Sequence, residues 1–162
     1  ELHELGAVLT VADVDPLKAE RAEREFGASV VGLDDIFATP CDVFAPCALG
    51  SALNETTIPQ LQCKLVAGAA NNQLALPQTG DDLYQRGILY GPDYAINAGG
   101  VISIALAEPG GSDGVVVERV SAIGKTLGAI FARAEREKRP TGEVADEMAR
   151  ERLDRADTRR AA

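Results

Sequence analysis

The chain has 162 residues, which is enough for one domain with its own hydrophobic core. Hydrophobic residues make up 46% and charged residues 25%, as in ordinary globular proteins. The formal net charge of −9 argues against a nucleic-acid partner, because binding to phosphates depends on lysine and arginine. No apolar run reaches the roughly 20 residues of a membrane-spanning helix, and no signal peptide is recognisable. We therefore expect a cytoplasmic protein without a nucleic-acid or membrane partner.

The cysteines give no indication of a metal site. Cys41, Cys47 and Cys63 are spaced unlike any zinc motif, and His3 is the only histidine. Three unpaired cysteines suit a reducing compartment, and we expect them to be small buried thiols.

Short apolar segments alternate with helical segments over the first hundred residues. Glu1–Gly6 has the pattern of the last turns of a helix that ends at a glycine, so we expect the natural polypeptide to begin upstream. Strands are expected at residues 7–12, 28–31, 42–46, 64–68 and 87–90, the first of them buried on both faces. Helices or helical turns are expected at residues 16–26, 33–38, 58–62 and 81–86. This alternation indicates βαβ units and a parallel sheet.

The remainder is predicted to be helical. A helix opens at 98–101 and is broken at 108–111, after which Ser112 can cap a long helix. That helix carries apolar residues three or four apart, which predict one buried stripe: Val116, Val120, Ile123, Leu127, Ile130 and Phe131. Another helix follows Thr141, and the charged tail after Arg155 is expected to fray.

An acidic residue follows the first expected strand. In dinucleotide-binding folds, an acid at the end of the second strand accepts hydrogen bonds from the adenosine ribose, and Asp13 stands at such a strand end. The glycine-rich loop that normally lies about 20 residues earlier would fall before residue 1. The alternative is that Asp13 only starts a helix, as in many α/β proteins.

Three segments that follow strands are rich in small residues, namely residues 42–50, 67–73 and 92–101, and the last two also carry asparagines. Ligands of open parallel sheets bind outside the carboxyl ends of the strands. Small residues let the backbone approach a flat ring, and an asparagine can both donate to and accept from a carboxamide. Asparagine and glycine are also common in ordinary turns. Three such loops in one sheet favour a ligand site.

Taken together, the string around Cys47, the Asn71–Asn72 pair and the Asn97–Val101 string resemble the leucine/phenylalanine/valine dehydrogenases, relatives of glutamate dehydrogenase. The resemblance is to their C-terminal NAD-binding domain, nearest to the leucine enzymes, and extends more loosely to Leu153. It implies an α/β, Rossmann-like doubly wound parallel sheet, here lacking its first strand and Gly-rich loop, followed by C-terminal helices. The implied domains are a truncated dinucleotide-binding domain (1–100), C-terminal helices at the interdomain hinge and substrate cleft (101–155) and a frayed tail (156–162).

The resemblance also implies function. The family deaminates an L-amino acid to its 2-oxo acid and ammonia while reducing NAD, and it forms homo-oligomers. The implied coenzyme-binding residues are Asp13 at the adenosine ribose, Ala48 and Leu49 along the nicotinamide ribose, Ala70, Asn71 and Asn72 at the nicotinamide, and Asn97 as their brace. The implied substrate pocket consists of Asn72, Val101 and Ile104.

Val101 and Ile104 share one face of the expected helix, since they are three residues apart. The glutamate enzymes carry a hydroxyl residue at the later position, and burying a carboxylate against Ile104 would be unfavourable. The phenylalanine enzymes favour a smaller residue at the earlier position. We therefore expect a branched-chain substrate such as leucine or valine, with a phenylalanine-type enzyme, or two plain core residues, as alternatives. Asp13 would repel a 2′-phosphate, which favours NAD over NADP.

The family's catalytic lysine and aspartate lie before the matched segment, so no catalytic residue is assigned here, and Lys18, Lys64, Lys125 and Lys138 are read as surface residues. Without the first strand, two strands would keep unpaired backbone edges. We expect the 162-residue piece alone to be unstable or to aggregate, and to be inactive. A non-catalytic NAD-sensing module is the competing interpretation.

Overall fold

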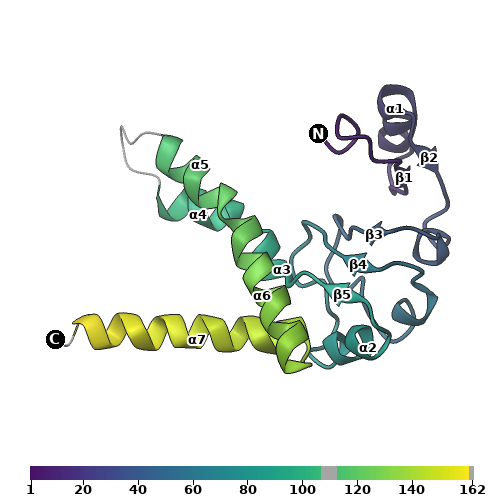
Figure 1. The fold of residues 1–162 in the computed structure, drawn as a ribbon. Coiled ribbons are helices and arrows are strands. Elements are labelled where there is room, and N and C mark those ends of the chain that lie inside the picture. The colour runs from purple at the N-terminus through teal and green to yellow at the C-terminus, as the bar shows by residue number, and fades with distance from the viewer. Residues whose placement is uncertain (107–112, 161–162) are drawn as a thin grey trace. The chain divides into compact units, whose positions relative to one another are not determined.

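The computed structural model describes residues 1–106 and 113–160 (Figure 1). Packing divides the chain into two compact units, residues 1–40 with 60–62 and residues 41–59 with 63–162. Each unit combines short parallel strands with helices, as the alternation of apolar and helical segments predicted. The expected functional boundary at residue 100 stays a prediction.

The first unit is a single βαβ crossover. β1 (Thr10–Val11) pairs in parallel with β2 (Ser29–Val30), and α1 (Pro16–Phe26) joins them (Figure 1). The helix begins where sequence rules place it, because the Asp15 carboxylate accepts a hydrogen bond of 3.0 Å from the Leu17 amide. It ends at Gly27, whose left-handed φ of 62° suits a residue without a side chain. A 3-10 turn, η1 (Ile36–Ala38), follows.

Two expectations for this unit are wrong. Residues 1–6 form an isolated turn that closes at Gly6, where φ is 86°, and no helix is assigned there. The strand expected at 7–12 is reduced to β1, and Val8 just before it is 97% exposed instead of buried. The strand is short and Val8 is exposed because, among the described residues, β1 has a partner strand on one of its two edges.

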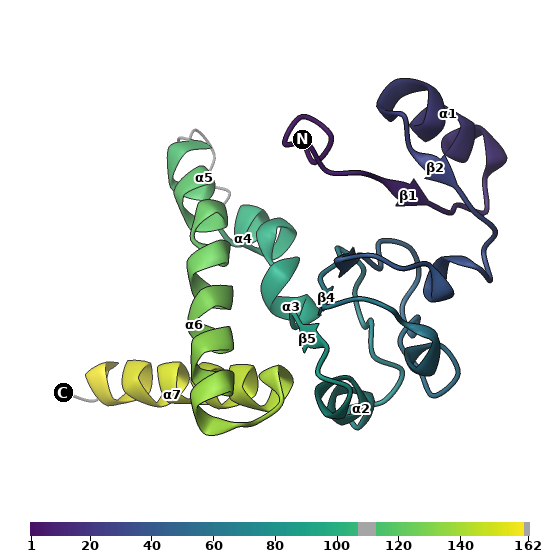
Figure 2. The ribbon, with the colours of Figure 1, turned by 45° about the vertical axis from the view of Figure 1, so that its right-hand side comes forward.

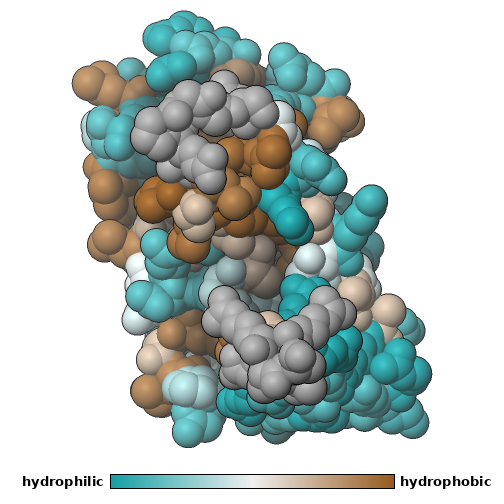
Figure 3. Space-filling view, turned by 90° about the vertical axis from the view of Figure 1, so that its left-hand side faces the viewer, coloured by the Kyte–Doolittle hydropathy of each residue, from teal (hydrophilic) through white to brown (hydrophobic). Residues whose placement is uncertain are grey.

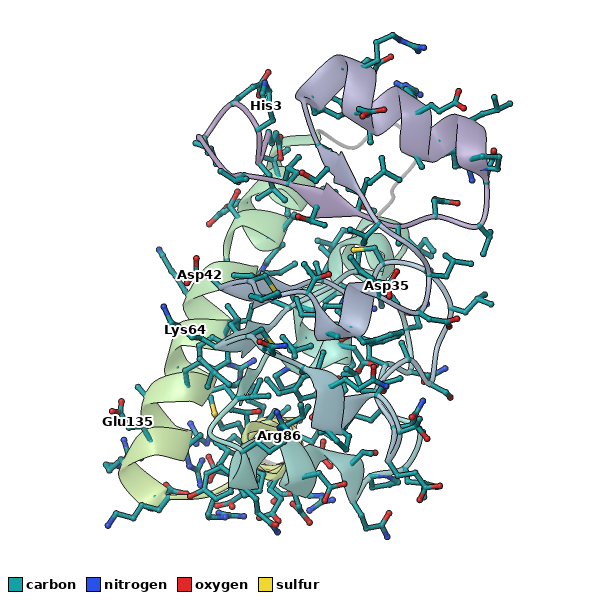
Figure 4. All side chains as sticks on the ribbon, turned by 90° about the vertical axis from the view of Figure 1, so that its right-hand side faces the viewer. His3, Asp35, Asp42, Lys64, Arg86 and Glu135 are labelled. Carbon is teal, nitrogen blue, oxygen red and sulfur yellow. The ribbon has the colours of Figure 1, made fainter. Side chains whose placement is uncertain are left out.

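The second unit contains a parallel sheet in the order β3–β4–β5: β3 (Val43–Phe44), β4 (Leu65–Val66) and β5 (Leu89–Tyr90). A 3-10 turn, η2 (Ile58–Gln60), lies between β3 and β4, and α2 (Thr79–Gln85) connects β4 to β5. Just before β3 and β4, Asp42 and Lys64 form an exposed ion pair of 2.9 Å (Figure 4). The hydrogen bond from Lys64 lowers the pKa of Asp42, and the same bond raises the pKa of Lys64.

The core of this sheet is mostly aliphatic, with two aromatic side chains, Phe44 and Tyr90. Buried side chains come from the strands, from α2 and from the connections: Phe44, Leu53, Ile58, Val66, Leu83, Ile88 and Tyr90. Each strand expected in this sheet is present but shorter than predicted, because only two residues of each strand lie opposite a partner on the adjacent strand.

Within the described residues, five helices follow the last strand: α3 (Asp93–Ile96), α4 (Gly99–Ala105), α5 (Asp113–Ser121), α6 (Ile123–Glu137) and α7 (Thr141–Arg160). Figure 2 shows α6 and α7 meeting at a steep angle, and their contact is an apolar cluster of Ile130, Ala134, Val144 and Ala145. None of the helices in the described ranges is long and apolar enough to cross a membrane.

Arginines of α6 and of the turn after it bind glutamates of α7. Arg133 is ion-paired with Glu151 at 2.9 Å and with Glu147, and Arg139 binds Glu147 at 2.6 Å. The hydrogen bond from Arg139 is the main cause that lowers the pKa of Glu147.

The structure corrects three details of the helical region. The single long helix expected after Ser112 is two helices, α5 and α6, separated at Ala122. Its apolar stripe is buried only toward the end of α6, since Ile130 is 3% exposed and Val120 is 37% exposed, and apolar side chains gather on the surface around α5 (Figure 3). Helix α7 continues to Arg160, beyond the predicted start of fraying. The predicted break at 108–111 and the Ser112 cap lie outside the described residues.

Candidate functional site

The loop that follows β4 is held tightly against the loop that follows β3. The Ala70 amide donates to the Pro46 carbonyl at 3.0 Å, and the Ser51 amide donates to the Asn72 carbonyl at 2.7 Å. At Gly68 a Cβ atom would lie 2.5 Å from the Pro46 nitrogen, so only glycine fits this approach. The small residues seen in the sequence therefore allow two backbones to meet at the carboxyl end of the sheet.

The tip of the β4 loop is anchored on its far side as well. Leu53 and Leu74 form an isolated parallel bridge, and the Leu53 amide donates to the Gln73 carbonyl at 3.0 Å. Asn72 takes a left-handed φ of 51°, an arrangement that asparagine tolerates better than most residues. The tip formed by Asn71 and Asn72 is thus fixed at both ends, with both side chains exposed.

The same loop contacts the segment after β5. The Asn97 side-chain amide donates to the Asn71 Oδ1 at 2.6 Å and to the Ala70 carbonyl at 3.3 Å. One carboxylate oxygen of Asp93 accepts from the Gln73 amide at 2.8 Å. The structure therefore brings Ala70 and Asn71 of the loop after β4 together with Asn97 of the segment after β5.

Free amide groups remain on this loop tip. The Asn71 Nδ2 and the whole Asn72 side chain have no hydrogen-bond partner within the described part of the chain. Together they offer donors and an acceptor that complement a planar carboxamide, so these residues fit the nicotinamide end of a dinucleotide. Ala48 and Leu49 lie on the neighbouring β3 loop, and Leu49 is 84% exposed. Ala70 is 4% exposed, and its backbone binds the β4 loop to the β3 loop.

Helix α4 begins two residues after Asn97 and has an exposed apolar face. Val101 is 72% exposed and Ile104 is 81% exposed, so neither belongs to the chain's own core. Ile102, in contrast, is half-buried and lines an apolar groove of about 530 Å³ with α6 and α7. The face that carries Val101 and Ile104 is free to contact a ligand.

Short helix α3 is held in place by tyrosines. The Tyr94 hydroxyl donates to Asp146 on α7 at 2.6 Å, and burial is the largest cause that raises the Tyr94 pKa. Tyr90 accepts a hydrogen bond of 3.3 Å from the Asp93 amide, and burial likewise raises its pKa. Both hydroxyls therefore remain protonated near neutral pH and act as structural links.

Asp13 belongs to the first unit, whereas the other predicted site residues belong to the second. It is exposed, and its Oδ1 accepts a hydrogen bond of 2.9 Å from the Asp15 amide in the turn that precedes α1. The helix-entry role considered from the sequence is therefore real. The other carboxylate oxygen of Asp13, Oδ2, has no partner in the described residues, so a ligand hydroxyl could still bind there.

Sequence reasoning missed Gln73 and Asp93, and it was wrong about Cys47. Cys47 is exposed instead of buried, because it lies in the loop after β3, where its sulfur accepts a hydrogen bond of 3.5 Å from the Ala69 amide. Cys41 and Cys63 are half-buried, and burial raises the pKa of both thiols. Among the described residues, no group of three or more histidine, cysteine or acidic side chains is placed to hold a metal ion.

Parallel strands joined by helices, with free amides and small residues at their carboxyl ends, define an α/β protein with a candidate ligand site at one sheet edge. Residues 8–137 match the family model described as Glutamate/Leucine/Phenylalanine/Valine dehydrogenase. The chain therefore belongs to this dehydrogenase family.

Individual relatives carry different substrate names. The leucine dehydrogenase of Geobacillus stearothermophilus is 46% identical over 153 residues, which cover 94% of this chain and 42% of that protein. The phenylalanine dehydrogenase of Thermoactinomyces intermedius is 38% identical over 154 residues, with 94% and 42% covered. The crystal structure of L-tryptophan dehydrogenase from Nostoc punctiforme superposes with a TM-score of 0.93 at 44% identity, covering 97% of this chain and 48% of that one. The chain thus spans less than half the length of these relatives.

Proposed function

We propose that the protein carrying this chain is an NAD-dependent dehydrogenase that deaminates a branched-chain L-amino acid to its 2-oxo acid and ammonia. The observation that carries this proposal is the pair Asn71–Asn72 with its free amides, which is braced by Asn97, two residues before the helix whose aliphatic side chains Val101 and Ile104 are exposed. Membership of the dehydrogenase family supports the reaction class.

Binding of the coenzyme follows from the free groups. Asn71 and Asn72 would exchange hydrogen bonds with the nicotinamide carboxamide, and Asn97 would keep Asn71 oriented. Ala48 and Leu49 would line the path of the adjoining ribose. The coenzyme held by these residues would supply the acceptor for the hydride that leaves the substrate α-carbon.

Asp13 supports the choice of NAD over its phosphorylated form. Its exposed carboxylate would accept hydrogen bonds from ribose hydroxyls and would repel a 2′-phosphate. The parallel strand pairing within each unit supports a Rossmann-like, doubly wound sheet as the fold of the coenzyme-binding domain.

The substrate class follows from Val101 and Ile104. Both are exposed, β-branched and aliphatic. An aliphatic substrate side chain that packed against them would be removed from water, which is favourable. A substrate carboxylate would be desolvated there without a partner, which disfavours glutamate. We propose leucine or valine as the substrate, with aromatic amino acids as the principal competitors.

The chain's share of the reaction is binding and orientation. Asparagine amides and aliphatic side chains do not exchange protons near neutral pH. The groups that transfer protons during deamination therefore lie outside the proposed site residues.

A substrate panel on the full-length protein tests the proposal. NADH formation is measured with leucine, valine, isoleucine, phenylalanine, tryptophan and glutamate at equal concentrations. We expect the highest kcat/KM with leucine or valine. Glutamate or an aromatic amino acid as the best substrate would refute the pocket assignment, and NAD binding without turnover of any amino acid would favour the sensing module.

A further inference from the structure

Gln73 lies directly beneath the candidate nicotinamide site. Its side chain is fully buried, with 0% exposure, and it follows Asn72 in the chain. The Nε2 group donates to the Gly68 carbonyl at 2.7 Å and to the Ala70 carbonyl at 3.0 Å. Both amide hydrogens are thus used to close the β4 loop from the inside.

The backbone of Gln73 ties the same loop to two others. Its amide donates to the Asp93 carboxylate at 2.8 Å, and its carbonyl accepts from the Leu53 amide at 3.0 Å. The Ala70 carbonyl that accepts from Gln73 also accepts from Asn97, at 3.3 Å. One residue therefore joins the β4 loop, the β3 loop and the segment that carries Asn97.

The oxygen of the Gln73 amide gives a second indication. Oε1 is buried and has no hydrogen-bond partner among the described residues. A buried acceptor without a partner lowers stability, and a methionine would occupy a similar volume without that cost. What glutamine provides here, and methionine does not, is the pair of donors that fixes the loop.

We propose that Gln73 is a positioning residue for the nicotinamide end of the coenzyme, acting through the Asn71–Asn72 tip. This inference rests on the proposed function. Because its side chain is buried, Gln73 does not touch the coenzyme itself. It sets the backbone from Gly68 to Asn72, and that backbone determines where the free asparagine amides point.

The test compares two ligands in the full-length protein. NAD and ADP-ribose share the adenosine diphosphate ribose portion, but only NAD has a nicotinamide. For Gln73→Met we expect the Kd for NAD to rise about tenfold, as loss of a hydrogen-bonded support implies, and the Kd for ADP-ribose to change less than about twofold. A rise in the Kd for NAD without a matching rise in the Kd for ADP-ribose would show that Gln73 positions the nicotinamide end.

A matched control separates positioning from general loss of stability. The Thr141 hydroxyl is buried and donates to the Tyr90 carbonyl at 2.7 Å, and neither Thr141 nor Tyr90 is a proposed site residue. Thr141→Val should lower the melting temperature and leave both dissociation constants unchanged. If Gln73→Met does not fold, Asp93→Ala removes the acceptor of the Gln73 amide, and we expect the same selective loss, about threefold.

Three outcomes would overturn the inference. One is an unchanged Kd for NAD, and another is an equal rise for NAD and ADP-ribose; in both cases the parent still binds NAD, so only the positioning role fails. The third is a parent protein that binds no NAD at all, which refutes the proposed function and this inference with it.

Discussion

Replacing Gly68 with a slightly larger residue tests whether the close contact between the β3 and β4 loops is required. Replacing it with alanine adds one methyl group, which would lie 2.5 Å from the Pro46 nitrogen and 2.7 Å from the Pro46 carbonyl carbon. Atoms in contact prefer separations of about 3.5–4.0 Å. The neighbouring atoms belong to backbone, so they cannot rotate away as a flexible side chain would.

Two effects lower the free energy of unfolding of Gly68→Ala. Overpacking of this kind destabilises a protein by about 1–3 kcal/mol. Relief requires Gly68 to move away from Pro46, which strains the hydrogen bond from the Ala70 amide to the Pro46 carbonyl and that from the Gln73 side chain to the Gly68 carbonyl, each worth about 0.5–1.5 kcal/mol. We therefore expect Gly68→Ala to lower the free energy of unfolding by about 3 kcal/mol.

Urea unfolding and NADH fluorescence titration of the full-length protein measure both consequences. The matched control is Gly128→Ala on α6, where an added Cβ would meet nothing within 4 Å. This change should stabilise the protein by about 0.5–1 kcal/mol, because alanine favours a helix over glycine. If Gly68→Ala unfolds at the same urea concentration as Gly128→Ala and binds NADH equally well, the close approach of the two loops is not required.

Further changes test the remaining assignments. Asn97→Ala removes two hydrogen bonds to the β4 loop and should weaken NAD binding up to about tenfold; unchanged affinity in a fluorescence titration would contradict the bracing role. Ile104→Ser should shift the kcat/KM ratio of glutamate to leucine toward glutamate by about tenfold, and a constant ratio would argue against a pocket residue. Glu147→Gln should lower the melting temperature at neutral pH, while Glu135→Gln on the exposed side of α6 should not. Because Arg139 lowers the pKa of Glu147 in the folded state, its contribution is present above the unfolded pKa of about 4.3 and lost as the pH falls below it. The melting temperatures of parent and Glu147→Gln should then converge in acid.

Local rules predicted where most elements lie. The Asp15 cap, Pro16 and Gly27 delimit α1 as expected, because these residues act within one turn of the chain. Strand lengths were overestimated, since the length of β4 depends on which residues of β3 and β5 stand opposite it. Helix α3 was missed because four residues are too few to display a helical period.

Some residues of the candidate site could be identified from the sequence and others could not. The asparagines were recognisable because their residue type and their place after strands carry the information. The burial of Gln73 was not recognisable, because it depends on Asp93 and Leu53, which are twenty residues away on either side in the sequence. Similarly, the loss of burial along α5 reflects which helix faces meet, and an apolar period alone does not specify that.

A crystal structure of the full-length protein with NAD tests the central claim most directly. We predict that the nicotinamide carboxamide lies about 3 Å from the side-chain amide of Asn71 or Asn72, with Val101 and Ile104 facing the space beside the ring. A nicotinamide bound elsewhere, with both asparagines left in water, would contradict it.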